Sequence, residues 1–172
     1  WGLAFDAAPT DEKLINALAG IMDTAGNQLQ LGAIHYTRGD GYKGWRQYFV
    51  HQINIRGWIF SGNNSYTAFN TLSAKGSFFR PGLELSRQLK NLFNWETGIK
   101  YSGEFNRNLN RQWDTLSALS FGFNTYEFYL RSNQALPNKW AFLYQKRNDQ
   151  LPNGNKLQEA NHSDNFKIST EF

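Results

Sequence analysis

Histidine is the side chain best suited to proton transfer near neutral pH, and one of the three histidines stands beside a hydroxyl residue at strand spacing. His35 and Thr37 are two residues apart, so both side chains point to the same face if this segment is a strand. Such an imidazole activates a hydroxyl nucleophile when a carboxylate orients the ring. The pair is therefore a candidate catalytic site, and the alternative is an ordinary pair of strand residues.

The other two histidines give weaker patterns. His162, Ser163 and Asp164 contain the residue types of a catalytic triad, but consecutive residues point away from one another, so we interpret them as a polar loop before the final strand. His51 is in phase with apolar neighbours and is interpreted as a packed or interfacial histidine. The sequence has no cysteine, no metal-ligand spacing and no glycine-rich phosphate loop, so we expect no metal and no cofactor.

Charged residues form the second candidate site. In residues 94–106, alternate positions carry charges at four-residue steps, and other segments add charges in the same phase. If these residues share one face of a barrel, they either pair and fill a narrow lumen or set the solute selectivity of a wide one. The predicted lumen residues are Arg56, Glu96, Lys100, Glu104, Glu127 and Arg131.

The elements that position these residues are predicted to be strands, because the hydropathy period is two from Gln28 onward. The clearest case is residues 94–106, where Trp95, Thr97, Ile99, Tyr101, Gly103 and Phe105 alternate with mostly polar residues. Similar patterns predict strands at 45–60, 66–78, 82–89, 115–123, 126–131, 140–146 and 166–172. Each strand therefore has one apolar and one polar face.

Other segments are predicted to be a helix, turns and loops. A cap at Thr10 followed by Leu14, Ile15, Leu18 and Ile21 predicts an amphipathic helix at about 11–22. Hairpin turns are predicted at 61–64, 80–82, 90–91 and 124–125. Exposed loops are predicted at 106–112, 132–139 and 149–165.

The composition fits one domain at residues 1–172, with a helix at about 11–22 and strands from about 28 to 172. Aromatic residues make up 16% and charged residues 19%, which excludes a disordered chain. No run approaches the ~20 apolar residues of a membrane helix. A mean hydropathy of −0.62 is what alternating strands give. The net charge of +4 is spread along the chain and selects no partner by itself.

Aromatic residues cluster at the ends of the predicted strands. The predicted strands at 45–60 and 94–106 exceed the ~9–11 residues that a tilted strand needs to cross a bilayer. Aromatic side chains at strand ends are typical of the girdles at both membrane interfaces. The predicted interface aromatics are Trp58, Phe60, Phe78, Phe79, Phe93 and Trp95.

The last residues add a resemblance. Phe166, Ile168 and Phe172 alternate like the C-terminal assembly signal of bacterial outer-membrane β-barrel proteins, which the alternating chain also resembles. The resemblance implies an all-β, antiparallel up-and-down barrel of about 8–10 strands, either complete or part of a larger barrel. It also implies the bacterial outer membrane, with lipid bilayer and lipopolysaccharide as partners and small solutes or other envelope proteins as further ones.

Three functions follow as expectations. The first is a non-enzymatic, porin-like channel, transport component or membrane-anchored structural or surface-binding protein. The second is an outer-membrane lipid hydrolase, because His35 and Thr37 resemble the His-x-Ser strand of lipid A deacylases, with threonine in place of serine. The third is a soluble β-barrel that binds a ligand or nucleic acid through basic and aromatic residues such as those of 75–80. Nucleic acid is disfavoured, since a membrane face explains the alternation more simply.

Overall fold

The computed structural model describes residues 13–38, 41–90, 95–110, 115–132 and 138–171, with only the backbone described at 13–16. These residues form ten strands: β1 (Lys13–Met22), β2 (Gln28–Thr37), β3 (Lys43–Ile55), β4 (Trp58–Asn70), β5 (Ala74–Arg80), β6 (Gly82–Leu89), β7 (Trp95–Asn110), β8 (Phe121–Arg131), β9 (Lys139–Asn153) and β10 (Lys156–Glu171). No helix long and apolar enough to cross a membrane occurs among them. The predicted all-β, antiparallel architecture is confirmed.

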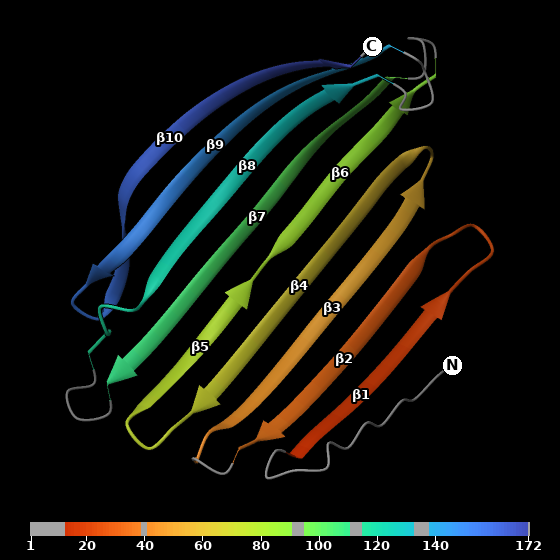
Figure 1. Cartoon of the computed structure of the whole chain (residues 1–172). Helices are drawn as coiled ribbons and strands as arrows, with labels where there is room; N and C mark the ends of the chain where they lie inside the picture. Colours follow the sequence, from red (N-terminus) through yellow and green to blue (C-terminus); the bar gives the residue numbers. More distant parts are fainter. Residues whose placement is uncertain (1–12, 39–40, 91–94, 111–114, 133–137, 172) are drawn as a thin grey trace.

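Neighbouring strands in the chain are neighbours in the sheet, except where β5 and β6 share one place (Figure 1). Both strands lie between β4 and β7 and follow one another along the same line. Pro81 separates them, because proline has no N–H for the ladder. The backbone is nevertheless held there, since Gly103 N donates to Pro81 O at 3.0 Å. The predicted hairpin turn at 80–82 is therefore wrong.

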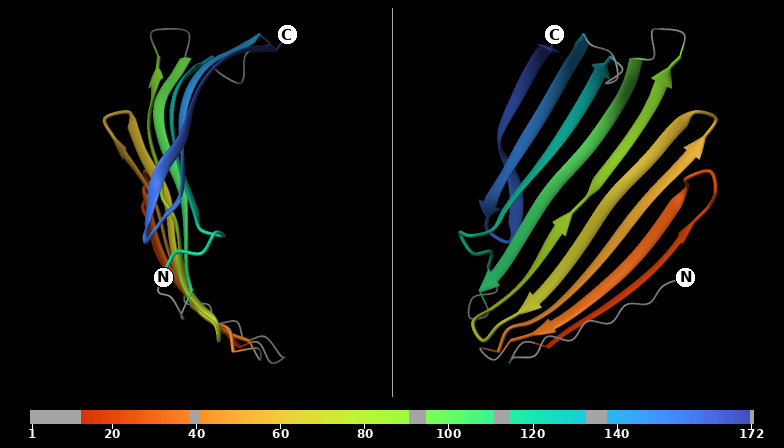
Figure 2. Two further views of the ribbon diagram at one scale, coloured as in Figure 1. Left: turned by 90° about the vertical axis from the view of Figure 1, so that its left-hand side faces the viewer. Right: turned by 45° about the vertical axis from the view of Figure 1, so that its right-hand side comes forward.

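The sheet is a single curved layer (Figure 2). The solvent-accessible surface of the chain is 11810 Å², whereas a compact monomer of this mass exposes about 8,600 Å². In the described part of the chain Leu116 is the only large hydrophobic side chain that is buried. The sheet thus has no hydrophobic core of its own, and neither face is covered by a second layer of described residues.

The two faces differ in chemistry, as the strand register shows. One row across β6 to β9 contains Glu84, Lys100, Glu127 and Gln145, and the adjacent row contains Leu85, Ile99, Phe128 and Tyr144. Because adjacent residues of a strand point to opposite sides, these rows define a polar face and an apolar face. The predicted division of residues 95–106 between two faces is confirmed.

The sheet is open in the described residues, because β1 pairs only with β2 and β10 only with β9. Closure into a barrel is not observed and stays a prediction. The predicted helix at about 11–22 is wrong for residues 13–22, which form β1, and residues 11–12 lie outside the described part. Ala17, Ala19 and Ile21 also alternate, and pairing with β2 along all ten residues of β1 favours the strand.

Several predicted boundaries are wrong because the turns lie elsewhere. The predicted strand 45–60 is broken by a two-residue turn at Arg56 and Gly57, both with positive φ, 50° and 83°. This is the backbone of a type I′ hairpin, and the predicted turn at 61–64 lies inside β4. The predicted turn at 124–125 lies inside β8, and the predicted loop 149–165 forms most of the β9–β10 hairpin.

Glycines on the polar face, among them Gly32 and Gly98, give room for tyrosine rings. A Cβ on Gly32 would lie 1.9 Å from the Tyr48 ring, and a Cβ on Gly98 would lie 2.4 Å from the Tyr129 ring. Each ring therefore lies flat over the backbone of the neighbouring strand, in the manner of aromatic rescue of strand glycines. This packing replaces part of the missing core.

Candidate functional site

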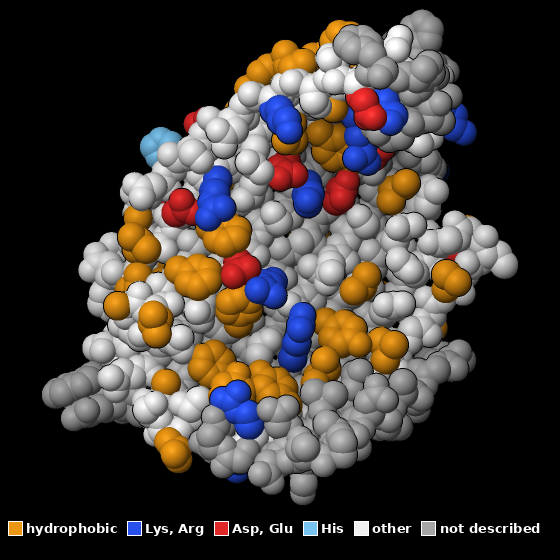
Figure 3. Space-filling view, in the orientation of Figure 1, with side chains coloured by type: hydrophobic (Ala, Val, Ile, Leu, Met, Phe, Trp, Pro, Cys, Tyr) orange, Lys and Arg blue, Asp and Glu red, His pale blue; other side chains and the backbone are white. Residues whose placement is uncertain are grey.

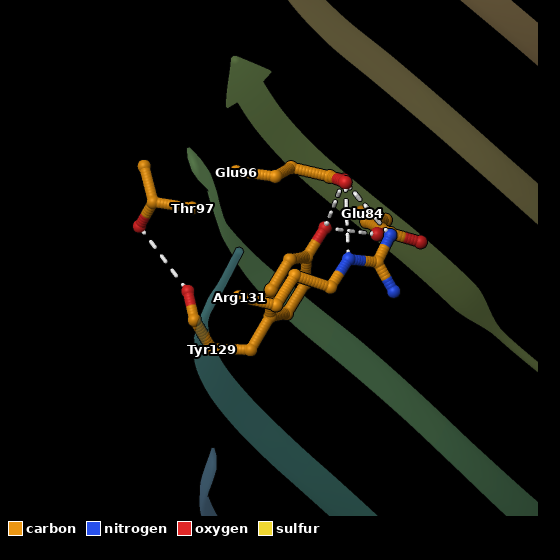
Figure 4. A network of polar contacts seen from close by, with 5 residues as sticks. All are labelled: Glu84, Glu96, Thr97, Tyr129 and Arg131. Carbon is orange, nitrogen blue, oxygen red and sulfur yellow. Dashed lines mark hydrogen bonds and ion pairs between the residues drawn. The ribbon is translucent and has the colours of Figure 1, made fainter. Parts of the chain in front are cut away.

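A carboxylate, tyrosine and arginine network occupies the polar face of β6, β7 and β8 (Figure 4). Tyr129 Oη lies 2.5 Å from Glu84 Oε1 and 3.2 Å from Glu96 Oε1, and its hydroxyl donates to the nearer oxygen. Arg131 donates from Nε to Glu96 Oε2 and from Nη2 to Glu96 Oε1, both at 3.0 Å. The Arg131 guanidinium thus donates two hydrogen bonds to Glu96, and the Tyr129 hydroxyl donates one to Glu84.

Further ion pairs continue across the same face. Lys100 Nζ lies 3.8 Å from Glu127 Oε2, and Gln145 Nε2 donates to Glu127 Oε1 at 2.8 Å. The other pairs are Arg80 with Glu104 at 3.1 Å, Arg147 with Asp149 at 2.7 Å and Lys139 with Glu171 at 3.1 Å. Figure 3 shows positive and negative side chains interleaved on this face. The charges that this face carries on β5 to β10 largely neutralise one another.

The structure brings together five of the six predicted lumen residues. Glu96, Lys100, Glu104, Glu127 and Arg131 all lie on the polar face of β7 and β8. Arg56 is different, because it lies in the turn between β3 and β4 and not on a strand face. Tyr129 was not among the predicted lumen residues, although it is in phase with Glu127 and Arg131 in the sequence and so shows the same alternation.

Arginine side chains also stack on aromatic rings of the polar face. The Cζ atoms of Arg80 and Arg147 lie 4.3 Å and 4.1 Å from the ring centroids of Phe78 and Phe123. Phe78 was predicted as an interface aromatic on the apolar side, but register pairing with Asn106 puts it on the polar face. The cation–π contacts explain how a phenylalanine is accommodated there.

The remaining predicted interface aromatics lie on the apolar face where the structure describes them. Trp58 and Trp95 are the first residues of β4 and β7, and Phe60 is close behind Trp58. Phe79 is the penultimate residue of β5, but β6 continues the same line, so Phe79 lies within the sheet and not at its end. Phe93 lies outside the described residues.

The apolar face is exposed over most of the sheet. Trp45, Phe60, Ile99 and Phe128 are 42%, 40%, 56% and 50% exposed. From β2 to β9, the described residues place no Asp or Glu on this face. Monomeric soluble proteins rarely leave so large an apolar surface bare, and surfaces of this kind are typical of interaction sites.

The apolar band crosses the strands obliquely. The row that contains Phe142 on β9 ends at Ile55, the last residue of β3. The lower row with Tyr66, Phe79 and Phe105 reaches polar Gln150 on β9. The band therefore shifts along the strands from β3 to β9.

The predicted catalytic pair lies on the apolar face. His35 and Thr37 share this face of β2, and the His35 ring contacts that of Trp45 at 6.5 Å between centroids. No carboxylate among the described residues bonds to His35, and Asp40 lies outside them. The described residues therefore provide no carboxylate that orients the His35 ring for activation of the Thr37 hydroxyl.

The other histidines are packed or exposed. His51 is buried between Phe49 and Phe60, with ring centroids at 4.9 Å and 4.7 Å, and its two nitrogens have no hydrogen-bond partner. The predicted loop at 162–164 is instead part of β10. Within it Asp164 accepts a hydrogen bond from Tyr144 Oη at 2.6 Å.

No cluster of three or more His, Cys, Asp or Glu able to hold a metal occurs in the part of the chain that the structure describes. Comparison with protein-family models, curated proteins and solved structures gives no match. The functional evidence is therefore the structure itself, a single-layer sheet with one polar and one apolar face and without a hydrophobic core.

Proposed function

We propose that this chain forms the wall of a bacterial outer-membrane β-barrel and is not an enzyme. In this proposal the apolar face contacts lipid and the polar face lines the interior, as a passive channel or transport component or as a membrane-anchored structural protein. The observation that carries the proposal is the pair of uncovered, chemically opposite faces on a single layer. A bilayer against the apolar face and a water-filled or side-chain-filled lumen against the polar face give each face a matching environment.

The oblique apolar band supports this proposal. Strands of a membrane barrel tilt by about 35–45° from the barrel axis. A band of constant height in the bilayer must therefore shift along successive strands, as the band does from β3 to β9. A soluble sandwich gives no reason for such a shift when nothing covers the face.

Strand length gives further support. Eight strands have 10 to 16 residues, and β5 and β6, with 7 and 8, join end to end beside β4. Crossing a bilayer takes about 9–11 residues in a tilted strand. Each line of the sheet is thus long enough to span.

The polar face favours a structured interior over an open, strongly selective one. The ion pairs Arg80–Glu104 and Arg131–Glu96 each join side chains of neighbouring strands and so restrain them. Paired charges leave little net field, so a channel built on this face would discriminate weakly by charge. No observation among the described residues favours the lipid hydrolase.

Extraction and conductance test the proposal. We expect the protein to require detergent for extraction, and to migrate differently on a gel before and after boiling, as folded barrels do. Full solubility in detergent-free buffer would contradict the membrane assignment and favour a soluble β protein that binds a ligand or nucleic acid. In planar bilayers, a channel gives steps of constant conductance, and silent but inserted protein identifies the structural role.

A further inference from the structure

Arg87 is a charged residue on the apolar face. It lies two residues after Leu85 on β6, so both side chains point to the same side of the sheet. Its Cζ atom lies 5.2 Å from the ring centroid of Trp58, its register partner on β4. An arginine on the lipid face of a barrel destabilises the fold most at the bilayer midplane and little near the interfaces. Because tryptophan also favours the interfaces, we expect Arg87 and Trp58 at the level of the lipid headgroups.

A cavity of ≈800 Å³ lies where the β3–β4 turn meets the end of β6, two elements that are neighbours in the sheet (Figure 1). Three cations line it: Arg56 from the turn, Arg87 from β6, and Lys90, which directly follows β6. The amide side chains of Asn54 and Gln88 add hydrogen-bond donors. No acidic residue is among the described residues that line the cavity, so its chemistry suits an anion.

The three cations form no ion pair with any carboxylate of the described residues, whose ion pairs join other side chains. Glu96 lies opposite Gln88 in the strand register, but it already accepts two hydrogen bonds from Arg131. Arg56 also has a φ of 50°, and strained backbone conformations of this kind cluster at functional sites. The positive charge of the cavity is therefore available to a ligand.

The spacing of the cations fits one multiply charged group. Arg87 and Lys90 are three residues apart, or about 10 Å in extended chain, and Arg56 lies two residues before the register partner of Arg87. Long arginine and lysine side chains can converge over this distance, and guanidinium groups bind phosphate oxygens with paired hydrogen bonds. A phosphate monoester carries about −1.5 to −2 charges at pH 7, which matches several cations better than a single carboxylate does.

We propose that this cavity binds the phosphate monoester of a membrane lipid, with Arg56, Arg87 and Lys90 around the phosphate. The acyl chains then lie on the apolar face, where Phe60 and Leu85 form the next row below Trp58 and Arg87. The proposal rests on the proposed membrane function and adds a lipid headgroup class. A lipid is favoured over a free anion because Arg87 reaches the cavity from the face that contacts lipid in the proposed barrel.

Native mass spectrometry of the full chain in detergent micelles tests this by counting bound lipids. The chain is titrated with phosphatidic acid, which has a phosphate monoester, or with phosphatidylcholine of the same acyl chains. We expect phosphatidic acid to bind at lower concentration. Arg87→Gln/Lys90→Gln should weaken its binding about fivefold for each cation, the change that corresponds to about 1 kcal/mol per cation at an anionic surface. Binding of phosphatidylcholine should not change.

Arg56→Asn is a second variant, because asparagine adopts positive φ readily and the turn is expected to fold at least as well. It should also weaken binding of phosphatidic acid about fivefold. The gel shift between unboiled and boiled samples checks that each variant is folded. Unchanged affinity for phosphatidic acid in folded Arg56→Asn and folded Arg87→Gln/Lys90→Gln overturns the site.

The matched control is Arg46→Gln/Lys156→Gln, which also removes one arginine and one lysine, from β3 and β10, where neither forms an ion pair with a described residue. An equal loss in this control, or equal binding of both lipids by the unmodified chain, overturns the headgroup site. Binding of inorganic phosphate as tight as that of phosphatidic acid would identify a free anion as the ligand and also overturn it. Full solubility of the chain without detergent is a separate outcome, and it contradicts the proposed membrane function itself.

Discussion

Arg131 and Glu96 face each other across β7 and β8 with two parallel hydrogen bonds of 3.0 Å. Both residues lie on the polar face, and Tyr129 Oη approaches the same carboxylate at 3.2 Å. This arrangement joins neighbouring strands through their side chains at a place where the fold has no apolar core. The pair is therefore the clearest point at which to test how the polar face stabilises the sheet.

Removing either partner of this pair should lower stability slightly. Exposed ion pairs contribute about 0.2–1 kcal/mol, and the bidentate geometry favours the upper end. We expect Arg131→Gln and Glu96→Gln each to lower the free energy of unfolding by up to about 1 kcal/mol, and the double variant to lose less than their sum. Urea titrations in detergent micelles measure this coupling, and strict additivity would show that the pair does not interact.

Gly98 should tolerate no side chain while Tyr129 is present. A Cβ at Gly98 would meet the Tyr129 ring at 2.4 Å, so Gly98→Ala must displace the ring from Glu84. We expect a loss of about 1–3 kcal/mol, the usual range for overpacking, and partial recovery when Tyr129→Ser is added. Gly20→Ala is the control, because its Cβ would meet the flexible Gln30 side chain at 3.2 Å. Equal effects at Gly98 and Gly20 would contradict the packing account.

The turn between β3 and β4 should improve when Arg56 is replaced. Arg56 has φ of 50°, a conformation that glycine and asparagine adopt more readily than arginine. We expect Arg56→Asn to raise the free energy of unfolding by up to about 1 kcal/mol, and Gly57→Ala to lower it by about 1 kcal/mol or more. No atom lies within 4 Å of a Cβ at Gly57, so strain alone would cause that loss. A destabilised Arg56→Asn would point to an unrecognised contact of the arginine.

The turn between β1 and β2 should respond to acid. Hydrogen bonds from the side chain and backbone N–H of Asn27 lower the pKa of Asp23 below its ordinary value of 3.8. This contribution to stability is fully present above the unfolded pKa and is lost as the pH falls through the lowered folded value. The wild type should therefore lose more stability than Asp23→Asn between pH 5 and pH 2. Parallel losses in urea titrations across this range would contradict the assignment.

The alternation of polar and apolar residues predicted the two faces because it depends only on strand geometry. Residues 95–106 could be assigned to the polar or the apolar face without information on which strands lie beside them. The register of the strands could not be predicted in the same way. The register brings Tyr129 of β8 next to Glu84 of β6 and Glu96 of β7.

The prediction failed where local signals were ambiguous. Residues 13–22 carry apolar side chains at spacings compatible with a helix or a strand, and only pairing with β2 decides between them. The hairpin at Arg56 and Gly57 was not predicted, because arginine is unusual at positive φ and so gives no turn signal. Pro81 indicated a turn, but neighbours on both sides, β4 and β7, keep β5 and β6 in one line.

Neighbouring residues on opposite faces test the membrane account most directly. The sequence has no cysteine, so a single nitroxide label can be attached at Ile99→Cys, Lys100→Cys, Phe128→Cys or Glu127→Cys. Ile99 and Phe128 pair on the apolar face, and Lys100 and Glu127 pair on the polar face. After reconstitution in vesicles, labels at 99 and 128 should collide with oxygen dissolved in the lipid, and labels at 100 and 127 should not. Equal access of all four labels to a water-soluble nickel complex would contradict a bilayer on the apolar face.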